Sequence, residues 1–310
     1  MSKYLFSKNA LTRPWTESPF FYKLLCHSNY NDKEKKQLID FHENGYLIID
    51  LKLKKEEINN IIKDTYKYSE LAKNQYVNKI PTSDEYKNKT DIKLHSDIYT
   101  FTESPRLFEG WKNSKNIKDL TTHPDILKIL KLLYNKTPFP FSTINFTKGS
   151  GQPYHSDTIH FHTIPYYWMT GVWIALEDVD SKNGALQVIP KSHRWDLYNY
   201  NDLNLKHPDE ICNGEELNYR EYEHFIKELI KVKGGKDKII ELKKGEAIIW
   251  AANLLHGGIE IKDQTRTRHS QVNHYFYKDC KKYYHPMFSQ PLEGIYANKW
   301  CDDKNNISTI

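Results

Sequence analysis

The chain has 310 residues and a formal net charge of +5, with 27% charged and 38% hydrophobic residues. Its 22 Tyr and 7 Trp fit a globular protein with an aromatic core, and the spread of basic residues along the chain argues against nucleic-acid binding. No run of about 20 apolar residues and no signal-peptide core is present, so we expect a cytoplasmic protein that does not bind membranes.

Helical periodicity dominates the first part of the chain. Residues 34–42 have helical spacing, the helix is stopped at Asn44-Gly45, and a short β-type run follows. Further helices are predicted over 54–71 and from Pro124 onward. We expect these helices to back onto a sheet.

After Pro140 the pattern changes to short strands separated by Gly, Pro and Asn. They are predicted at 141–147, 171–179, 184–189, 237–242, 246–250 and 267–277. A helix at about 216–231 interrupts them. Helices followed by many strands predict an α+β, mainly β fold with a sandwich or barrel. The chain shows no repeat or linker, so we expect one domain over residues 1–310.

One pattern of metal ligands is central to the functional hypothesis. A 2-His-1-carboxylate site binds Fe(II) through three protein ligands and leaves positions open for a co-substrate and O2. Two ligands one residue apart on a strand point to the same face, and the third ligand must come from a neighbouring strand. The pair HxD occurs four times, as His95-Ser96-Asp97, His123-Pro124-Asp125, His155-Ser156-Asp157 and His207-Pro208-Asp209.

Sequence context separates the four HxD pairs. The two that contain proline are typical of turns and helix starts, where Asp is favoured by the helix dipole. His95 lies among helical elements and fits the rim of a pocket better than a metal site. His155-Ser156-Asp157 follows a predicted strand, and its best distant partner is His256, which precedes two glycines. The prediction is that His155, Asp157 and His256 bind the metal and are catalytic.

Four motifs, namely the HxD pair and three longer segments, occur in the right order and resemble one enzyme family. GVWIALEDVDSKNGALQVIPKSHR (171–194), after the HxD pair, resembles the signature of the phytanoyl-CoA dioxygenase-like oxygenases. FHENGYLIIDL (41–51) is similar to that family's amino-terminal segment, and RHSQVNHYF (268–276) to its last barrel strand. The resemblance covers about residues 37–280 and leaves 281–310 as a C-terminal extension.

The resemblance implies a double-stranded β-helix, a jelly-roll or cupin-like barrel backed by helices. It implies Fe(II) held by His155, Asp157 and His256, with 2-oxoglutarate and O2 as co-substrates. The expected reaction is hydroxylation of a substrate C–H bond with release of succinate and CO2.

The resemblance also implies an arginine after the distal histidine that binds the far carboxylate of 2-oxoglutarate. Arg266 and Arg268 compete for this role, because they would share a face of a strand. Arg268 begins an Arg-x-Ser segment in which Ser270 can bind the same carboxylate, whereas Arg266 falls in a polar run that is typical of a turn. We therefore predict Arg268 and Ser270 as co-substrate contacts.

Further residues are candidates for the pocket. Thr143 and Asn145 share one face of a predicted strand, and we expect this polar face to line the barrel and contact the co-substrate. Trp173 is expected either to pack beside the co-substrate or to belong to the core. His160 and His162 follow the metal pair and are candidates for substrate contact.

Two other classes of function compete with the oxygenase. One is a non-catalytic β-helix protein that binds a small molecule, which the three ligands and an arginine argue against. The other is a zinc hydrolase, because two His and one Asp also suit Zn²⁺ with an open position. In each case the expected partner is a small molecule, whose identity the sequence leaves open together with the oligomeric state.

Overall fold

The computed structural model describes residues 13–77, 106–200, 202–205 and 215–286, together with Ser289 and Gly294. Its helices are η1 (Trp15–Glu17), α1 (Phe21–Cys26), α2 (Asp32–Asn44), α3 (Lys55–Val77), η3 (Gly110–Lys112), α4 (Lys115–Thr121), α5 (Pro124–Tyr134), η4 (Asp157–Ile159), η5 (Ser192–Arg194) and α6 (Glu215–Lys233). Its strands are β1 (Tyr46–Asp50), β2 (Arg106–Phe108), β3 (Pro138–Phe146), β4 (His162–Ile164), β5 (Met169–Ala175), β6 (Leu186–Val188), β7 (Lys238–Ile240), β8 (Glu246–Ala251), β9 (His256–Gly258), β10 (Ser270–Tyr277) and β11 (Lys282–Tyr284).

The strands form two main antiparallel sheets. The larger one has six strands in the order β1-β8-β5-β10-β3-β2, and the smaller one has three in the order β7-β6-β9. Strands β11 and β4 form a separate pair. The sheets do not join into a closed, continuously hydrogen-bonded barrel. The predicted α+β, mainly β class is confirmed.

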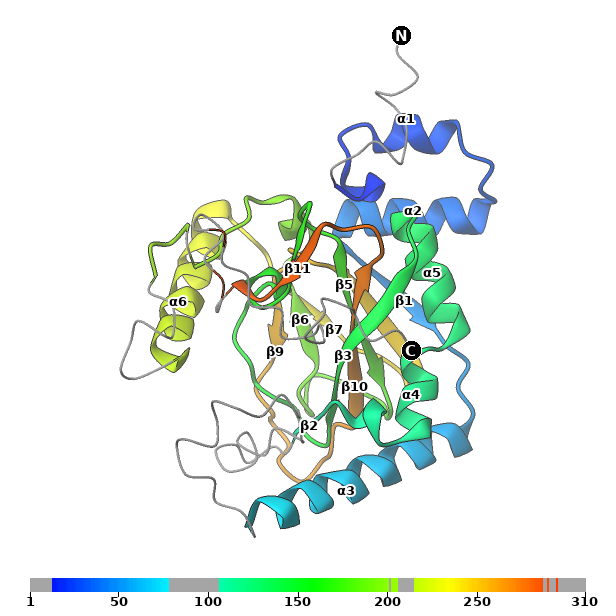
Figure 1. The fold of residues 1–310 in the computed structure, drawn as a ribbon, viewed down its shortest axis with the longest axis vertical. Helices are drawn as coiled ribbons and strands as arrows, with labels where there is room; N and C mark the ends of the chain where they lie inside the picture. Colours follow the sequence, from blue (N-terminus) through cyan, green and yellow to red (C-terminus); the bar gives the residue numbers. More distant parts are fainter. Residues whose placement is uncertain are drawn as a thin grey trace.

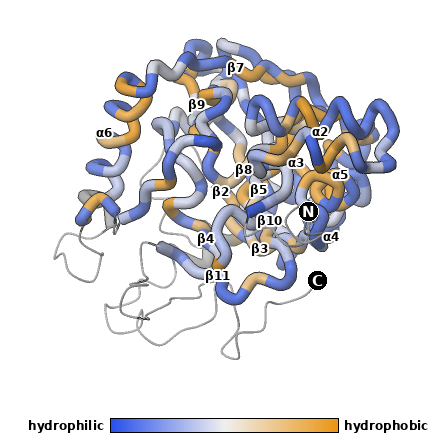
Figure 2. The backbone as a smooth tube through the Cα atoms, turned by 90° about the horizontal axis from the view of Figure 1, so that it is seen from above, coloured by the Kyte–Doolittle hydropathy of each residue, from blue (hydrophilic) through white to orange (hydrophobic). Residues whose placement is uncertain are grey.

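The helices cover one face of the large sheet. Figure 1 shows α2, α4 and α5 along one side of the strands and α6 on the other side. Alternate residues of β5, β8 and β10, among them Val172, Ile249 and Tyr275, are buried in one cluster with residues of α2 to α5. The apolar stretches of α2, α3 and α5 lie close together in Figure 2. The expected packing of helices against a sheet is therefore present.

The other face of the large sheet packs against the small sheet. Trp173, Ile248 and Val272 from the large sheet form one buried cluster with Leu186 and Ile240 from the small sheet. The strands have period-two alternation, so the residues on this inner face are set by the register. This inner space holds the site described below.

Local sequence signals fix the end of α2 and its passage into β1. Asn31 and Glu34 form a capping box at the start of the helix, as such pairs do. At the other end Gly45 has φ = 80°, and a Cβ there would lie 2.3 Å from Nδ1 of His193. Only glycine meets both conditions without strain, and the predicted stop of this helix is confirmed.

None of the helices in the described part of the chain combines the length and apolarity needed to cross a bilayer.

Candidate metal centre

Three predicted ligands come together between the sheets. The ligand atoms of His155, Asp157 and His256 all lie within 4.8 Å of one another, and all three residues are buried. His155 and His256 form a β-bridge in which each backbone N–H donates to the other's carbonyl at 2.9 Å. Asp157 begins the short helix η4, so the HxD pair lies at a turn rather than in a regular strand. The backbone bridge brings the two imidazoles together instead.

The glycine after His256 permits this close approach. A Cβ on Gly257 would lie 2.8 Å from the carbonyl oxygen of Gln152, which is closer than real side chains come. The loop that carries His155 therefore packs directly onto the backbone of β9.

Hydrogen bonds fix the tautomers of both histidines. Nδ1 of His155 lies 2.9 Å from the carbonyl oxygen of Pro153, and Nδ1 of His256 lies 2.9 Å from that of Leu254. A carbonyl can only accept, so Nδ1 carries the proton in both rings. The Nε2 lone pairs are left for a metal, as in other metal-binding histidines.

The protonation states suit a cation. Burial is the main cause that lowers the pKa of His155 to about 3, so this imidazole is neutral at physiological pH. Burial alone would raise the pKa of Asp157, but His256, His274, His155 and a hydrogen bond from Trp250 bring it below its ordinary value. Two imidazoles and one ionised carboxylate form the donor set of non-haem Fe(II) sites.

Arg268 lies on the inner side of the structure without an ion-pair partner. It is 1% exposed, and within the described part of the chain its NH groups donate to the carbonyl oxygens of Gly184 (3.3 Å) and Lys148 (3.2 Å). Its Nε has no partner, and no carboxylate of the described residues forms an ion pair with it. Burial lowers its pKa to about 9. A buried cation of this kind needs an anion to offset its desolvation.

Two other predicted co-substrate residues are Trp173, which lies beside Arg268, and Ser270, which follows it by two residues. The guanidinium carbon of Arg268 is 5.1 Å from the ring centroid of Trp173 and 5.3 Å from that of Phe146. The buried hydroxyl of Ser270 and the indole N–H of Trp173 lack partners within the described structure. Each of these polar atoms is available to a ligand.

A second cation, Arg106, was missed by the sequence analysis. Register pairs Arg106 with Phe146, and Phe146 with Ser270, so all three lie on the same face of the large sheet. The Arg106 guanidinium carbon lies 5.4 Å from the Phe146 ring centroid, and its Nε has no partner among the described residues. After burial, the charge of Arg106 is the next cause that lowers the pKa of Arg268. Arg106 lies on an edge strand of three residues, too short for a period-two signal.

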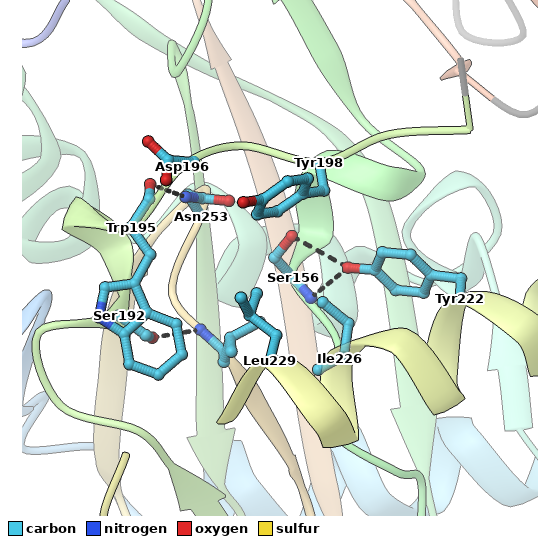
Figure 3. A pocket seen from close by; sticks show the side chains of 10 residues that line it. Ser156, Ser192, Trp195, Asp196, Tyr198, Tyr222, Ile226, Leu229 and Asn253 are labelled. Carbon is cyan, nitrogen blue, oxygen red and sulfur yellow. Dashed lines mark hydrogen bonds between the residues drawn. The ribbon is translucent and has the colours of Figure 1, made fainter. Parts of the chain in front are cut away.

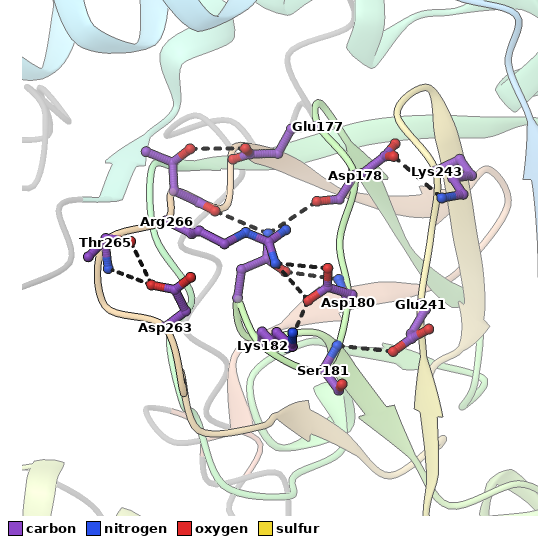
Figure 4. Close-up of polar contacts among 12 residues, drawn as sticks. Glu177, Asp178, Asp180, Ser181, Lys182, Glu241, Lys243, Asp263, Thr265 and Arg266 are labelled. Carbon is purple, nitrogen blue, oxygen red and sulfur yellow. Dashed lines mark hydrogen bonds and ion pairs between the residues drawn. The ribbon is translucent and has the colours of Figure 1, made fainter.

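Arg266 lies in a different environment. Its NH1 donates to both carboxylate oxygens of Asp180, at 3.0 and 2.8 Å, and its side chain is 33% exposed. Figure 4 shows this pair within a network of turn residues that includes Asp263 and Thr265. The structure thus separates the two arginines, because residues 266–269 precede strand β10 and do not follow its pleat.

Thr143 and Asn145 were predicted to contact the co-substrate, but the structure places them on the other face of the large sheet from Trp173 and Ser270. Register places Thr143 opposite Asn273 and Asn145 opposite Gln271, all on the face that α4 covers. Asn145 donates to Gln271 at 3.0 Å, and Gln271 donates to the carbonyl oxygen of Ile117 in α4 at 3.2 Å. Polarity suggested the inner face, but Asn145, Gln271 and Asn273 form a buried polar network beneath α4, and the hydroxyl of Thr143 has no partner within the described structure.

Helix α6 packs against the segment that carries the HxD pair. Tyr222 of α6 accepts a hydrogen bond from the backbone N–H of Ser156 at 3.1 Å. Beside it lies a small pocket, with room for about one water molecule, that Ser192, Asn253 and Tyr198 help to line (Figure 3). This pocket is too small for a substrate, and it lies on the side of Ser156 that faces α6.

The remaining histidine candidates have other neighbours. His160 stacks on Tyr219 at 5.2 Å and His162 on Tyr284 at 5.3 Å. His123 is the N-cap of α5 and accepts from the backbone of Asp125, in agreement with its structural interpretation. The triplets at His95 and His207 lie outside the described residues.

A buried 2-His-1-carboxylate set between the antiparallel sheets of a double-stranded β-helix defines a class of cupin-like metal proteins. The family model "Phytanoyl-CoA dioxygenase (PhyH)" matches residues 41–269. The chain belongs to this phytanoyl-CoA dioxygenase family, as the resemblance implied.

The individual relatives have low sequence identity to this chain. The chain is 24% identical over 233 residues to bovine peroxisomal phytanoyl-CoA dioxygenase, covering 72% of this chain and 63% of that protein. It is 27% identical over 163 residues to a probable phytanoyl-CoA dioxygenase of Caenorhabditis elegans, covering 50% and 51%. The chain thus spans about three fifths of the bovine relative and about half of the nematode one.

Solved structures share the fold. EctD from S. alaskensis with 2-oxoglutarate and 5-hydroxyectoine has a TM-score of 0.55 at 16% identity, covering 92% of this chain and 88% of EctD. The epimerase SnoN with Fe³⁺, α-ketoglutarate and nogalamycin RO has a TM-score of 0.54 at 14% identity, covering 86% and 93%. These similarities confirm the predicted double-stranded β-helix.

Proposed function

We propose that this protein is an Fe(II)- and 2-oxoglutarate-dependent dioxygenase that hydroxylates a C–H bond of a small molecule. The observation that carries the proposal is the joint presence, between the two sheets, of a buried His-Asp-His set and a buried arginine that has no acidic partner among the described residues. The first fits a divalent metal and the second fits a carboxylate.

The distance between the His-Asp-His set and Arg268 is suited to a single ligand that contacts both. Trp250 contacts Asp157, and Trp173 contacts Arg268. Register places Gly171 opposite Trp250, so the two tryptophans are offset by two residues along neighbouring strands, about 7 Å. An extended five-carbon dicarboxylate can bridge such a distance, with one end at the metal and the other at the arginine.

The residues then have separate tasks. His155, Asp157 and His256 would hold Fe(II), which together with 2-oxoglutarate supplies the oxidising chemistry. Arg268 and Ser270 would bind the far carboxylate through charge-assisted and hydroxyl hydrogen bonds. We infer that Arg106 reinforces this contact, because its free Nε shares the Phe146 face with Arg268.

The aromatic surroundings would orient the substrate and exclude water. Trp173 packs against the guanidinium of Arg268, and Phe161 lies 4.6 Å from the ring of His274 near the metal residues. Low polarity around the site strengthens the charge contacts inside it. We propose a small-molecule substrate, because EctD and SnoN were solved with such ligands.

The test measures succinate formed from 2-oxoglutarate by the purified protein. We expect formation with Fe(II) in air and none without O2, and we expect the His155→Ala, Asp157→Ala and His256→Ala variants to be inactive yet folded. The matched control is His123→Ala, which removes an HxD histidine that caps a helix, and it should retain activity.

The same assay separates the other classes of function. Absence of succinate under every condition, together with Zn²⁺-dependent hydrolysis of a candidate ester or amide that is unaffected by removing O2, would establish a hydrolase. Binding of 2-oxoglutarate without any turnover, in the presence of Fe(II), O2 and candidate metabolites, would establish a non-catalytic protein. Either result would overturn the proposal.

A further inference from the structure

One side chain outside the ligand set contacts two of the three ligands. The indole N–H of Trp250 donates to Oδ2 of Asp157 at 2.6 Å, and the indole lies 4.6 Å from the imidazole of His256, measured between ring centroids. Trp250 is 2% exposed. Its N–H can donate only one hydrogen bond, and the structure directs that bond at a metal-ligand carboxylate.

The neighbouring strand is shaped to receive this indole. Gly171 of β5 lies directly opposite Trp250 of β8, and a Cβ on Gly171 would lie 2.3 Å from Cε2 of the indole. Backbone conformation does not require glycine here, because Gly171 is not among the residues with positive φ. The glycine is therefore needed for the space that the indole occupies.

The contact divides the two oxygens of Asp157 between two partners. Oδ2 accepts from Trp250, whereas Oδ1 faces Nε2 of His256 at 3.6 Å. The ion-pair contact of Oδ2 in the described structure is with Nε2 of His274, at 3.8 Å, which is too far for a hydrogen bond. Without the indole N–H, the carboxylate could rotate or present both oxygens to a metal.

We propose that Trp250 is a positioning residue that holds Asp157 as a one-oxygen ligand, and that Gly171 is the small residue that allows it. This inference rests on the proposed metal site. Groups that orient a ligand in this way typically change metal affinity by about 10- to 100-fold when they are removed. One-oxygen coordination also leaves more positions on the metal for a co-substrate.

The experiment compares Trp250→Phe, which keeps an aromatic ring but removes the N–H, with Trp168→Phe. Trp168 is equally buried, at 1% exposure, but it packs on the helix side of the large sheet. Co²⁺ binding is followed by calorimetry and by visible absorption without co-substrates. We expect Trp250→Phe to raise the Kd about 10- to 100-fold and to alter the Co²⁺ spectrum, and Trp168→Phe to change neither.

An unchanged Kd and an unchanged spectrum in folded Trp250→Phe would overturn the proposal. Gly171→Ala provides a second variant, since it displaces the indole without removing it and should reproduce both effects. If neither variant folds, indole N–H resonances of the ¹⁵N-labelled native protein decide the matter. The indole N–H groups of Trp250 and Trp111 each donate to a carboxylate oxygen at 2.6 Å, so two of the 7 Trp signals should lie downfield, and only that of Trp250 should shift when Zn²⁺ is added. Absence of such a signal would refute the contact.

This outcome is distinguishable from failure of the proposed function. Co²⁺ and Zn²⁺ binding need neither O2 nor 2-oxoglutarate, so a protein that binds metal through Trp250-positioned Asp157 but forms no succinate would retain the positioning role. Conversely, succinate formation together with unaltered metal binding in Trp250→Phe would leave the dioxygenase proposal standing and remove the role of Trp250.

Discussion

Replacing Arg268 with alanine tests the co-substrate site. The guanidinium is 1% exposed, so its loss would leave the far carboxylate of 2-oxoglutarate in a site from which water is largely excluded. Truncating one partner of a buried charge pair typically costs about 2 to 5 kcal/mol, and 1.4 kcal/mol is a factor of ten in affinity. Arg106 remains nearby and places the expected loss at the lower end of that range. We expect Arg268→Ala to raise the KM for 2-oxoglutarate at least about tenfold.

Arg266→Ala is the matched control for this prediction. Arg266 has the same side chain two positions earlier, but it is 33% exposed and pairs with Asp180. Exposed pairs of this kind contribute less than about 1 kcal/mol, so the KM should change less than about threefold. The assay measures initial rates of succinate formation at varied 2-oxoglutarate and saturating Fe(II). The reverse ranking of the two variants would refute the reasoning and move the anchor to Arg266.

Three further predictions follow from the same geometry. Arg106→Ala should raise the KM for 2-oxoglutarate by a smaller factor, about two- to tenfold, and combining it with Arg268→Ala should abolish measurable binding by calorimetry; an unchanged KM would exclude Arg106 from the site. Asp157 would fill a ligand position with a negative charge, so chloride should not coordinate and mass spectrometry should find hydroxylated rather than chlorinated product. Burial lowers the pKa of His155 and His193 to about 3 and of His162 to about 4, whereas the unfolded chain binds these protons near pH 6.5. The metal-free protein should therefore lose stability as the pH falls from about 6.5 toward 4, by at least about 2 kcal/mol between pH 7 and 5 in urea unfolding; equal stability at both values would contradict this assignment.

Much of the architecture could be predicted because its signals are local. Asn31 caps the start of α2 through Glu34, and Gly45 ends the helix through a bond to Phe41, so each end depends on residues within four positions in the chain. The predicted strands near 141–147, 171–179 and 246–250 correspond to β3, β5 and β8. Propensity and breakers act over a few residues, so a single sequence contains the information.

The face of each strand that turns toward the site could not be predicted in the same way. Alternation shows that Thr143 and Asn145 share a face, but the choice between the two faces depends on which strands and helices cover them. The interpretation relied on polarity and chose the metal side, whereas Asn145 donates to Gln271, which in turn donates to α4 on the opposite side of the sheet. Nothing near Asn145 in the chain specifies that contact.

Two further residues of the site could not be predicted, because their partners lie far away in the sequence. Arg106 reaches the space beside Arg268 only because β2 adds to the edge of the large sheet. Trp250 was part of a predicted strand, yet its bond to Asp157 depends on the pairing of β8 with β5 and on the space at Gly171. The His-Asp-His set could be predicted only because the surrounding motifs distinguished one HxD pair from the other three.

The backbone bridge between His155 and His256 has a consequence for metal exchange in the cell. Reciprocal amide bonds of the backbone join these two residues, so the proposed donors would not have to be gathered from a disordered chain when metal arrives. Binding then releases less free energy into folding than it does in a zinc finger, which is unfolded without its ion. A protein of this kind can lose and regain its ion without refolding. Which ion it carries would then follow the free metal concentrations around it and the general order of metal affinities, in which Fe(II) binds more weakly than Zn²⁺.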